Sequence, residues 1–377
     1  MIHDYFTPAW KAGGPIRSLA QLIETTSADF SFNILCSAYD FGSKNKLTGI
    51  QTNTWTKQAN GVNIYYNEGR ITSLNFLIKR YVESNPDIIY INGLFSFQYN
   101  IICLLAAWKF RIHNPNVKII LSPRGMLHPG ALSQKRFKKK LYLELLKISR
   151  LPHLIHWHAT DVHESEFIKK QFGDVPLSIA GNFPKLSGIL SSPPKQPGSM
   201  IMGTLALISP MKNHLEILAS LKHITSNVIW HIYGPVKDQQ YWNECLHLIN
   251  SLPNNIKVVY HGALEPARVH ELFEKIHLYI QPSKSENFGH AILEALSAGK
   301  PVITTNTTPF TNLNEYKAGY TVPINQLEIQ LTRAIDMFSK MGPDEFSTYQ
   351  KGSADFANNF VNVANLKKQY AEMFQIQ

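Results

Sequence analysis

Short apolar runs alternate with amphipathic stretches along the whole chain, and this alternation limits the fold more than any other feature. In the first half, apolar runs at 32–38, 62–66, 88–92 and 117–122 are expected to form buried strands. Between them, apolar residues recur at helical spacing, at 16–25, 74–83 and 98–110. Parallel neighbours need a long crossover, so strands separated by helices predict a parallel sheet with helices on both faces.

The same pattern repeats after a proline-rich break. Residues 187–198 contain Pro193, Pro194 and Pro197 without periodicity, which predicts a linker. Beyond it, strands are expected at 199–203, 228–233, 256–261, 278–281 and 301–304. At 377 residues the chain is also too long for one ordinary core. We therefore predict two Rossmann-like, doubly wound α/β domains.

The boundaries that we expect are residues 1–186 for the first domain and 199–355 for the second. The last amphipathic stretch, 356–377, either closes the second domain or crosses back to the first. The chain opens at Met1–Asp4 as if at the end of a first strand, so this strand is expected to be short or to start upstream.

Composition indicates the cellular compartment of the protein and the charge of its partners. Cys36, Cys103 and Cys245 lie far apart without metal-binding spacing, so neither a disulfide framework nor a metal site is predicted. No basic segment followed by an apolar one opens the chain, and no apolar run approaches the roughly 20 residues that span a bilayer. We expect a cytoplasmic protein. Its net charge of +10 favours anionic partners.

The stretch 282–303 is the most informative motif. It has the pattern of a strand end, a loop, a helix that stops at Gly299, and a new strand. In open α/β sheets, ligands bind at the carboxyl ends of the strands, where helix N-termini present free N–H groups. Asn287, Phe288 and Gly289 are expected there, and Glu294 about one and a half turns further along the helix.

This stretch resembles glycosyltransferase family 4, the retaining GT-B glycosyltransferases also described as glycosyl transferases group 1. Glu286 and Glu294 match the family's pair of glutamates, which implies that Glu286 contacts the donor sugar and Glu294 the ribose hydroxyls. The resemblance places Asn287, Phe288 and Gly289 in the donor site and implies two domains facing a central cleft. The alternative is that both glutamates are ordinary carboxylates on a helix surface.

Other segments extend the resemblance over nearly the whole chain. Gly13 and Gly14 look like the glycine-rich loop that approaches the donor, although a plain turn can also carry two glycines. Arg124, in the segment 122–127, would face the acceptor or the diphosphate, or be a surface arginine. Lys212 matches the lysine that stabilises the leaving diphosphate, where a fixed cation is required.

The chain departs from the family at two positions. Leu207 stands where relatives usually carry an arginine, and Asn92 where they often have histidine. Leu207 weakens the expected stabilisation of the diphosphate unless Arg124 or another basic residue supplies the charge. The segment 307–310 resembles one that borders the site in relatives, or it is an ordinary loop.

The predicted function is that of a retaining hexosyltransferase acting on a nucleoside diphosphate sugar, with a glycan or lipid-linked glycan as acceptor. The process in which we expect this transfer to take place is the assembly of surface polysaccharide or glycolipid. No Asp-x-Asp occurs, so neither a metal nor another cofactor is expected. The alternative is a catalytically impaired nucleotide-sugar-binding protein of the same fold. Nucleic acid is not an expected partner, because no recognised nucleic-acid motif accompanies the basic residues.

The segment 135–150 is strongly basic and amphipathic. Phe137, Leu141, Leu145 and Ile148 recur near one helical face among lysines and arginines. Such a helix lies on an anionic membrane, which predicts a peripheral location at the inner face of the cell membrane. The alternative is that the apolar stripe packs against the domain core and the lysines are merely solvated.

Overall fold

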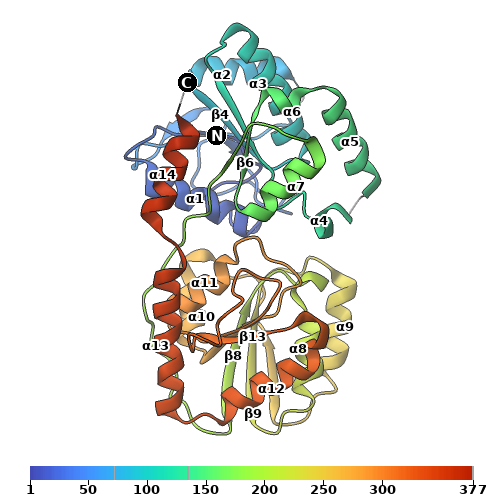
Figure 1. Cartoon of the computed structure of the whole chain (residues 1–377), viewed down its shortest axis with the longest axis vertical. Coiled ribbons are helices and arrows are strands. Elements are labelled where there is room, and N and C mark those ends of the chain that lie inside the picture. The colour runs from blue at the N-terminus through green and yellow to red at the C-terminus, as the bar shows by residue number, and fades with distance from the viewer. Residues whose placement is uncertain (72, 134–135, 376–377) are drawn as a thin grey trace. The chain divides into compact units, whose positions relative to one another are not determined.

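The computed structural model describes residues 1–71, 73–133 and 136–375, which form two compact units (Figure 1). Unit 1 contains Met1–Phe183 and Asn362–Gln377, and unit 2 contains Pro184–Val361. Each unit is an α/β structure with its own sheet and core.

Unit 1 has parallel strands with helices between them. Its strands are β1 (Asn33–Ser37), β2 (Trp55–Lys57), β3 (Asn63–Asn67), β4 (Ile88–Asn92), β5 (Lys118–Ser122), β6 (His156–Ala159) and β7 (Leu177–Ile179). The helices are α1 (Gly14–Thr26), α2 (Leu74–Ser84), α3 (Ile102–His113) preceded by the π-helical turn Phe97–Ile101, α4 (Pro129–Ser133), α5 (Arg136–Ile148), α6 (Leu151–Leu154), α7 (Val162–Phe172) and α14 (Val363–Phe374). Among the strands of unit 1 that the structure describes, β2 alone runs antiparallel to its neighbour.

Residues at the start of the chain join the two parts of this sheet. Ile2 forms bridges to both Leu35 of β1 and Ile91 of β4. The strand order is therefore β2, β3, β1, Ile2, β4, β5, β6 and β7. The predicted first strand is present as a short segment in the middle of the sheet.

The last helix, α14, packs in unit 1. The ring of Tyr370 stacks on that of Phe183, with 5.2 Å between centroids, and Phe374 meets Tyr90 edge to face. The Lys118 ammonium donates to the carbonyl of Met373 at 2.8 Å. The amphipathic stretch expected at 356–377 contains the end of one helix, at Phe360, and all of α14, which begins at Val363.

Unit 2 contains a six-stranded parallel sheet. Its strands are β8 (Ser199–Leu205), β9 (Asn227–Tyr233), β10 (Ile256–Tyr260), β11 (Leu278–Gln281), β12 (Val302–Thr305) and β13 (Gly319–Val322). The helices are α8 (His214–Leu221), α9 (Gln239–Ile249), α10 (Val269–Glu274), α11 (His290–Ser297), α12 (Leu327–Lys340) and α13 (Pro343–Phe360), with 3₁₀ turns at Pro210–Lys212, Pro266–Arg268 and Ile324–Gln326.

The strand order in unit 2 is β10, β9, β8, β11, β12, β13. The chain proceeds outward from β8 to β10 on one side and from β11 to β13 on the other. The order therefore reverses between β8 and β11, and in such sheets ligands bind at the carboxyl ends of the strands at this reversal.

The proline-rich segment predicted as a linker is fixed within unit 2. The buried Lys300 ammonium donates to the carbonyls of Leu190 at 3.3 Å and Ser191 at 2.7 Å. Burial lowers the pKa of Lys300 to about 8. Lys195 is held in turn by the carbonyls of Ser339 and Met341, both at 3.0 Å. Residues 187–198 thus pack on unit 2 in two ways: Lys300 donates to their backbone carbonyls, and Lys195, which is one of them, donates to carbonyls near the end of α12.

Across the described part of the chain, no helix combines the length and apolar character needed to cross a membrane.

Candidate functional site

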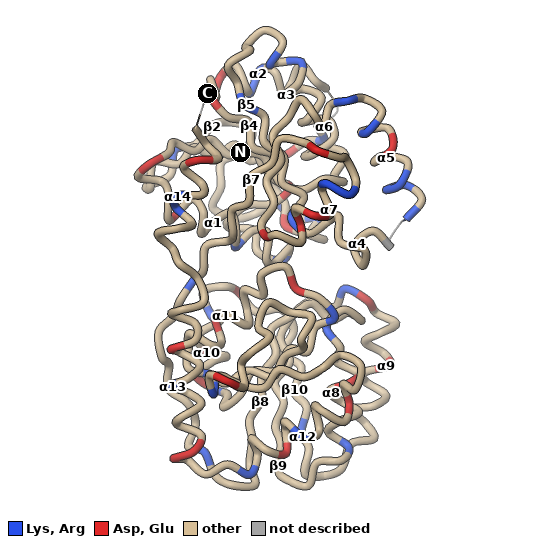
Figure 2. The backbone as a smooth tube through the Cα atoms, in the orientation of Figure 1, with Lys and Arg blue, Asp and Glu red and all other residues tan. Residues whose placement is uncertain are grey.

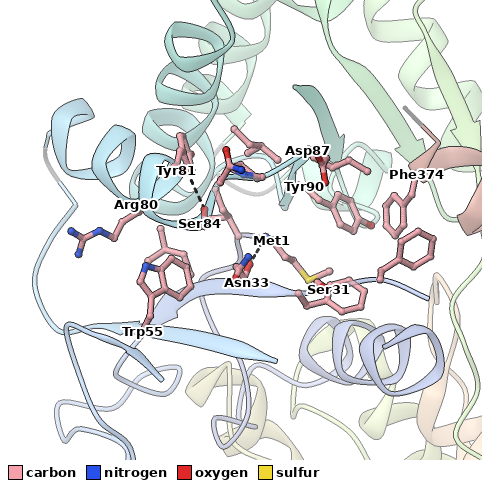
Figure 3. Close-up of a pocket in the computed structure, with 18 of the residues that line it drawn as sticks. Met1, Ser31, Asn33, Trp55, Arg80, Tyr81, Ser84, Asp87, Tyr90 and Phe374 are labelled. Carbon is pink, nitrogen blue, oxygen red and sulfur yellow. Dashed lines mark hydrogen bonds between the residues drawn. The ribbon is translucent and has the colours of Figure 1, made fainter. Parts of the chain in front are cut away.

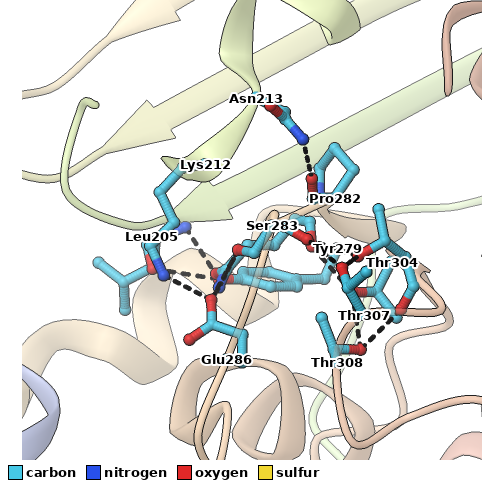
Figure 4. Close-up of polar contacts among 12 residues, drawn as sticks. Leu205, Lys212, Asn213, Tyr279, Pro282, Ser283, Glu286, Thr304, Thr307 and Thr308 are labelled. Atoms are coloured by element: carbon cyan, nitrogen blue, oxygen red, sulfur yellow. Dashed lines mark hydrogen bonds and ion pairs between the residues drawn. The ribbon is translucent and has the colours of Figure 1, made fainter. Parts of the chain in front are cut away.

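Lys212 and Glu286 meet at the carboxyl edge of the sheet in unit 2 (Figure 4). Lys212 ends the 3₁₀ turn after β8, and Glu286 lies in the loop between β11 and α11. Their side chains form a partly buried ion pair. The two residues therefore flank the point at which the strand order reverses.

Three donors converge on one oxygen of Glu286. Besides the Lys212 ammonium, the amide of Gln281 and the hydroxyl of Ser283 each donate to Oε1 at 2.6 Å. Gln281 is the last residue of β11 and is buried. The carboxylate is thus oriented by the strand that precedes its loop as well as by Lys212.

The loop that carries Glu286 is held through its backbone carbonyls. Asn213 donates from Nδ2 to the carbonyl of Pro282 at 2.7 Å, and Thr304 donates to that of Gln281 at 2.9 Å. The hydroxyls of Thr305 and Thr307 both donate to the carbonyl of Ser283. Side chains after β8, within β12 and just after β12 therefore fix the loop after β11, and Thr307 acts here as a structural residue.

A glycine sets the start of α11. Gly289 precedes the first helical residue with φ of 74°, in the left-handed region that favours glycine. A Cβ there would lie 2.7 Å from a ring carbon of Phe310. Glu294 is buried one turn into the helix, Asn287 is exposed, and Phe288 packs near Phe360.

The predicted glycine-rich loop opens α1 in unit 1. Gly13 has φ of 76° and caps the helix, and Gly14 is its first residue. The buried carboxylate of Asp40 accepts from the backbone N–H groups of Trp10 at 3.0 Å and Lys11 at 3.1 Å. Asp40, which sequence analysis did not single out, thus fixes the approach to this loop.

Arg124 is engaged within unit 1 by three side chains. Its Nε donates to Asn92 Oδ1 at 3.0 Å, and its two terminal nitrogens donate to Asn182 Oδ1 and to the Tyr90 hydroxyl, both at 2.7 Å. Arg124 therefore ties together the carboxyl ends of β4 and β5 and the segment after β7. The interpretation as a free surface arginine does not fit this network.

The network continues to a buried histidine. The Nε2 of His158 lies 2.8 Å from the carbonyl of Ala180, so it carries the proton and leaves Nδ1 as acceptor. The Tyr90 hydroxyl, 2.6 Å from Nδ1, then donates to His158. Burial, with a contribution from Arg124, lowers the pKa of His158 to about 3. The imidazole is neutral at physiological pH.

Unit 1 also contains a cavity of about 400 Å³ (Figure 3). It is lined by the first residues of β1 and β4, including Asn33 and Ile88, together with Trp55 and Phe374. The amino group of Met1 donates to the carbonyl of Asn33 at 2.7 Å at this cavity. It lies at the amino ends of the strands, whereas Asn92 and Arg124 lie at the carboxyl ends.

A known protein family matches part of the sequence, and solved structures match the fold over nearly the whole chain. Residues 190–352 match the family described as glycosyl transferases group 1. Curated protein sequences gave no match.

Among solved structures, sucrose-phosphate synthase from Thermosynechococcus elongatus is 14% identical with a TM-score of 0.67, covering 96% of this chain and 93% of its own. HepE from Anabaena, in complex with UDP and glucose, is 17% identical with a TM-score of 0.66 and 99% coverage of both chains. WaaG, a glycosyltransferase involved in lipopolysaccharide biosynthesis, is 12% identical with a TM-score of 0.64 and 98% coverage of both. The predicted fold class, two α/β units with parallel sheets, is confirmed.

Proposed function

We propose that this protein is a retaining glycosyltransferase that moves a sugar from a nucleoside diphosphate sugar to an acceptor hydroxyl, because residues 190–352 match the family described as glycosyl transferases group 1. One observation carries the proposal: Lys212 and Glu286 are paired at the carboxyl ends of β8 and β11, where the strand order of the sheet reverses. Nucleotide ligands of doubly wound sheets bind at this position.

In this proposal each residue of the site in unit 2 has a separate role in binding the donor. The Lys212 ammonium and the N–H groups at the start of α11, next to Gly289, stabilise the negative charge of the departing diphosphate. Glu286 contacts the donor sugar near its reacting carbon, and Glu294 binds the ribose hydroxyls. The acceptor hydroxyl approaches the same face of the sugar that the diphosphate leaves. Fixed donors in the protein supply the charge stabilisation, so the proposal needs no metal.

Unit 1 contributes by the positions of two loops. Gly13 and Gly14 allow close approach of the backbone to the donor. We assign Arg124 to the acceptor side as the residue that shapes its loop, because Asn92, Asn182 and Tyr90 already engage its guanidinium.

Uridine diphosphate sugars are the first donors to test, because HepE has been solved with UDP-glucose. The acceptor is a glycan or a lipid-linked glycan in the assembly of surface polysaccharide or glycolipid.

The face of α5 supports a location at the membrane. Its apolar stripe is exposed: Phe137 by 87%, Leu141 by 57%, Leu145 by 58% and Ile148 by 77%. The helix instead buries Leu143 and Leu146 on another side, so the interpretation that the stripe packs on the core is wrong. Gln134 and Lys135 lie outside the described residues.

Basic side chains accompany the exposed stripe. Lys138, Lys140 and Lys147 are exposed on α5, and Figure 2 shows the basic residues along this helix. Apolar side chains that enter the lipid boundary next to cations at the headgroups suit an anionic bilayer. We propose that α5 docks the protein on the inner face of the cell membrane.

Sedimentation with vesicles tests this docking. Wild type should sediment with vesicles of phosphatidylcholine and phosphatidylglycerol but not with phosphatidylcholine alone. Phe137→Ser with Ile148→Ser should lose binding, whereas Val82→Ser, at an exposed apolar position on α2, should retain it. Equal binding by all three proteins would contradict the proposal.

The donor site is tested first by thermal shift with uridine, guanosine and adenosine diphosphates and their sugars. A ligand at about 100 times its Kd adds about 2.7 kcal/mol to the free energy of unfolding. A shift with one nucleotide family, absent in Lys212→Ala and Glu294→Ala, supports the site. A shift without sugar transfer favours the alternative of an impaired binding protein, and no shift contradicts both.

A further inference from the structure

Gln281 lies between a buried tyrosine and Glu286. Its Nε2 donates to Glu286 Oε1 at 2.6 Å, and its Oε1 accepts from the Tyr279 hydroxyl at 2.5 Å. Both Tyr279 and Gln281 belong to β11 and are buried. A chain of two hydrogen bonds therefore links the interior of the sheet to the carboxylate at its edge.

The backbone of β8 determines the direction of this chain. The N–H of Leu205 donates to the Tyr279 hydroxyl at 3.1 Å, so this oxygen is an acceptor on that side. Its own proton then goes to the nearer acceptor, Oε1 of Gln281, rather than to the Leu205 carbonyl at 3.1 Å. This contact fixes the amide so that its NH₂ group faces Glu286.

Gln281 fixes the orientation of the Glu286 carboxylate, which Lys212 alone cannot do. An ammonium on a flexible four-carbon chain attracts a carboxylate without fixing its orientation. The amide of Gln281 comes from a buried strand and is held on both sides. With Ser283, it places a second and third donor on Oε1 and leaves Oε2, among the described residues, for a ligand.

We propose that Gln281 is a positioning residue for sugar transfer, which holds Glu286 in the orientation required at the reacting carbon, and that Tyr279 fixes its amide. This inference rests on the proposed function of Glu286. Since Gln281 would not touch the nucleotide, its loss should slow turnover while leaving nucleotide affinity unchanged. Displacing a catalytic group by about 1 Å can cost roughly 100-fold in rate.

Three variants test the chain: Gln281→Met, Tyr279→Phe and the double variant. The readouts are kcat and KM for transfer from UDP-glucose to water or acceptor, the Kd for UDP by calorimetry, and the Tm. Gln281→Met should lower kcat about 10- to 100-fold with the Kd for UDP within about threefold of wild type. Tyr279→Phe should cause a smaller loss.

The double variant tests whether Tyr279 affects kcat only through Gln281. If Tyr279 acts only through Gln281, its removal has no further effect on kcat once Gln281 is methionine, so the two losses are not additive. The matched control is Thr204→Val, which removes buried hydrogen bonds to Ile280 and Trp230 beside the chain. It should lower the Tm and leave kcat within about twofold of wild type.

The outcomes separate this inference from the function on which it rests. If the wild type binds no nucleotide and turns over no nucleoside diphosphate sugar, the proposed function is overturned. If the wild type is active and Gln281→Met keeps its kcat, or loses kcat only as much as Thr204→Val does at equal loss of Tm, the positioning role of Gln281 is overturned.

Discussion

The ammonium of Lys212 and the carboxylate of Glu286 form an ion pair although 74 positions separate them in the sequence. Each group follows one of the two strands at which the order of the sheet reverses. A diphosphate that binds Lys212 must therefore compete with Glu286 for the same ammonium. In the proposed function, a donor that takes over Lys212 would leave Oε1 of Glu286 held by Gln281 and Ser283.

Substitution of Lys212 by methionine keeps most of the packing of its side chain and removes the charge. We expect kcat to fall about 100-fold or more, because a fixed donor to the developing charge is lost. Lys284→Met is the control, since Lys284 lies exposed in the same loop as Glu286. Steady-state rates with a nucleoside diphosphate sugar give the comparison, and equal losses in the two variants would argue against a specific role for Lys212.

Leu207 offers a gain-of-function test. Its neighbour Ile208 bridges Val236, so the backbone beside Leu207 is held in place by the segment after β9. An arginine at this half-buried position adds a second cation after β8. We expect Leu207→Arg to tighten UDP binding about tenfold, as a charge-assisted hydrogen bond contributes about 1.5 kcal/mol or more. Calorimetry with UDP decides; weaker binding than wild type would show that the position cannot serve the diphosphate.

Gly289 should tolerate no side chain. Gly289→Ala adds a methyl group 2.7 Å from Phe310 at a φ of 74°. We expect the free energy of unfolding to fall by about 2–4 kcal/mol from steric overlap and backbone strain. Gly262→Ala, at a φ of 73° with no atom near the added methyl group, is the control and should cost only about 1–2 kcal/mol. Urea denaturation followed by fluorescence measures both, and equal losses would rule out the contact with Phe310 as the cause.

His214 predicts a dependence of stability on pH. Its imidazole is buried against Trp230, neither ring nitrogen has a partner among the described residues, and burial lowers its pKa to about 3. In the unfolded chain it takes up a proton below its ordinary pKa of about 6.5, while the folded state does not. Its contribution to stability is therefore lost as the pH falls from 6.5 toward 3.

His214→Phe keeps the stacked ring and removes the titrating group. We expect it to raise the free energy of unfolding by about 1 kcal/mol at pH 7, because buried nitrogens no longer lack partners. The advantage over wild type should grow by up to about 2 kcal/mol at pH 5. Urea denaturation at the two pH values provides the measurement. A difference that stays constant with pH would mean that His214 is not neutral in the folded state.

The sequence predicted the elements that have strong patterns. The strands at 88–92 and 278–281 were predicted with the bounds that the structure has. The strand β6 was missed because its sequence, His-Trp-His-Ala, lacks an apolar run, and β7 because three residues carry too little periodicity. Both are held by pairing with neighbours distant in the sequence, which no local pattern records.

In the candidate site, too, some residues were predicted from the sequence and others were found only in the structure. Lys212 and Glu286 were predicted from their motifs, and the structure brings them together. The sequence did not predict the roles of three other residues, Gln281, Asn213 and Thr304. These residues orient Glu286 or hold its loop through hydrogen bonds, which motif spacing does not reveal. The attachment of the segment 187–198 to unit 2 could not be predicted for a related reason: it depends on Lys300, which donates to the carbonyl of Ser191, and on Lys195, which donates to the carbonyl of Ser339.

The return of α14 to unit 1 affects the order in which the protein can be completed during synthesis. Unit 2 is one continuous stretch, Pro184–Val361, so all of its residues have been made before α14 leaves the ribosome. Unit 1 begins first but must wait for Tyr370 and Phe374 to cover Phe183 and Tyr90. Nascent unit 1 therefore exposes aromatic surface until α14 has been made, and the unit encoded second is the first that can reach its native state.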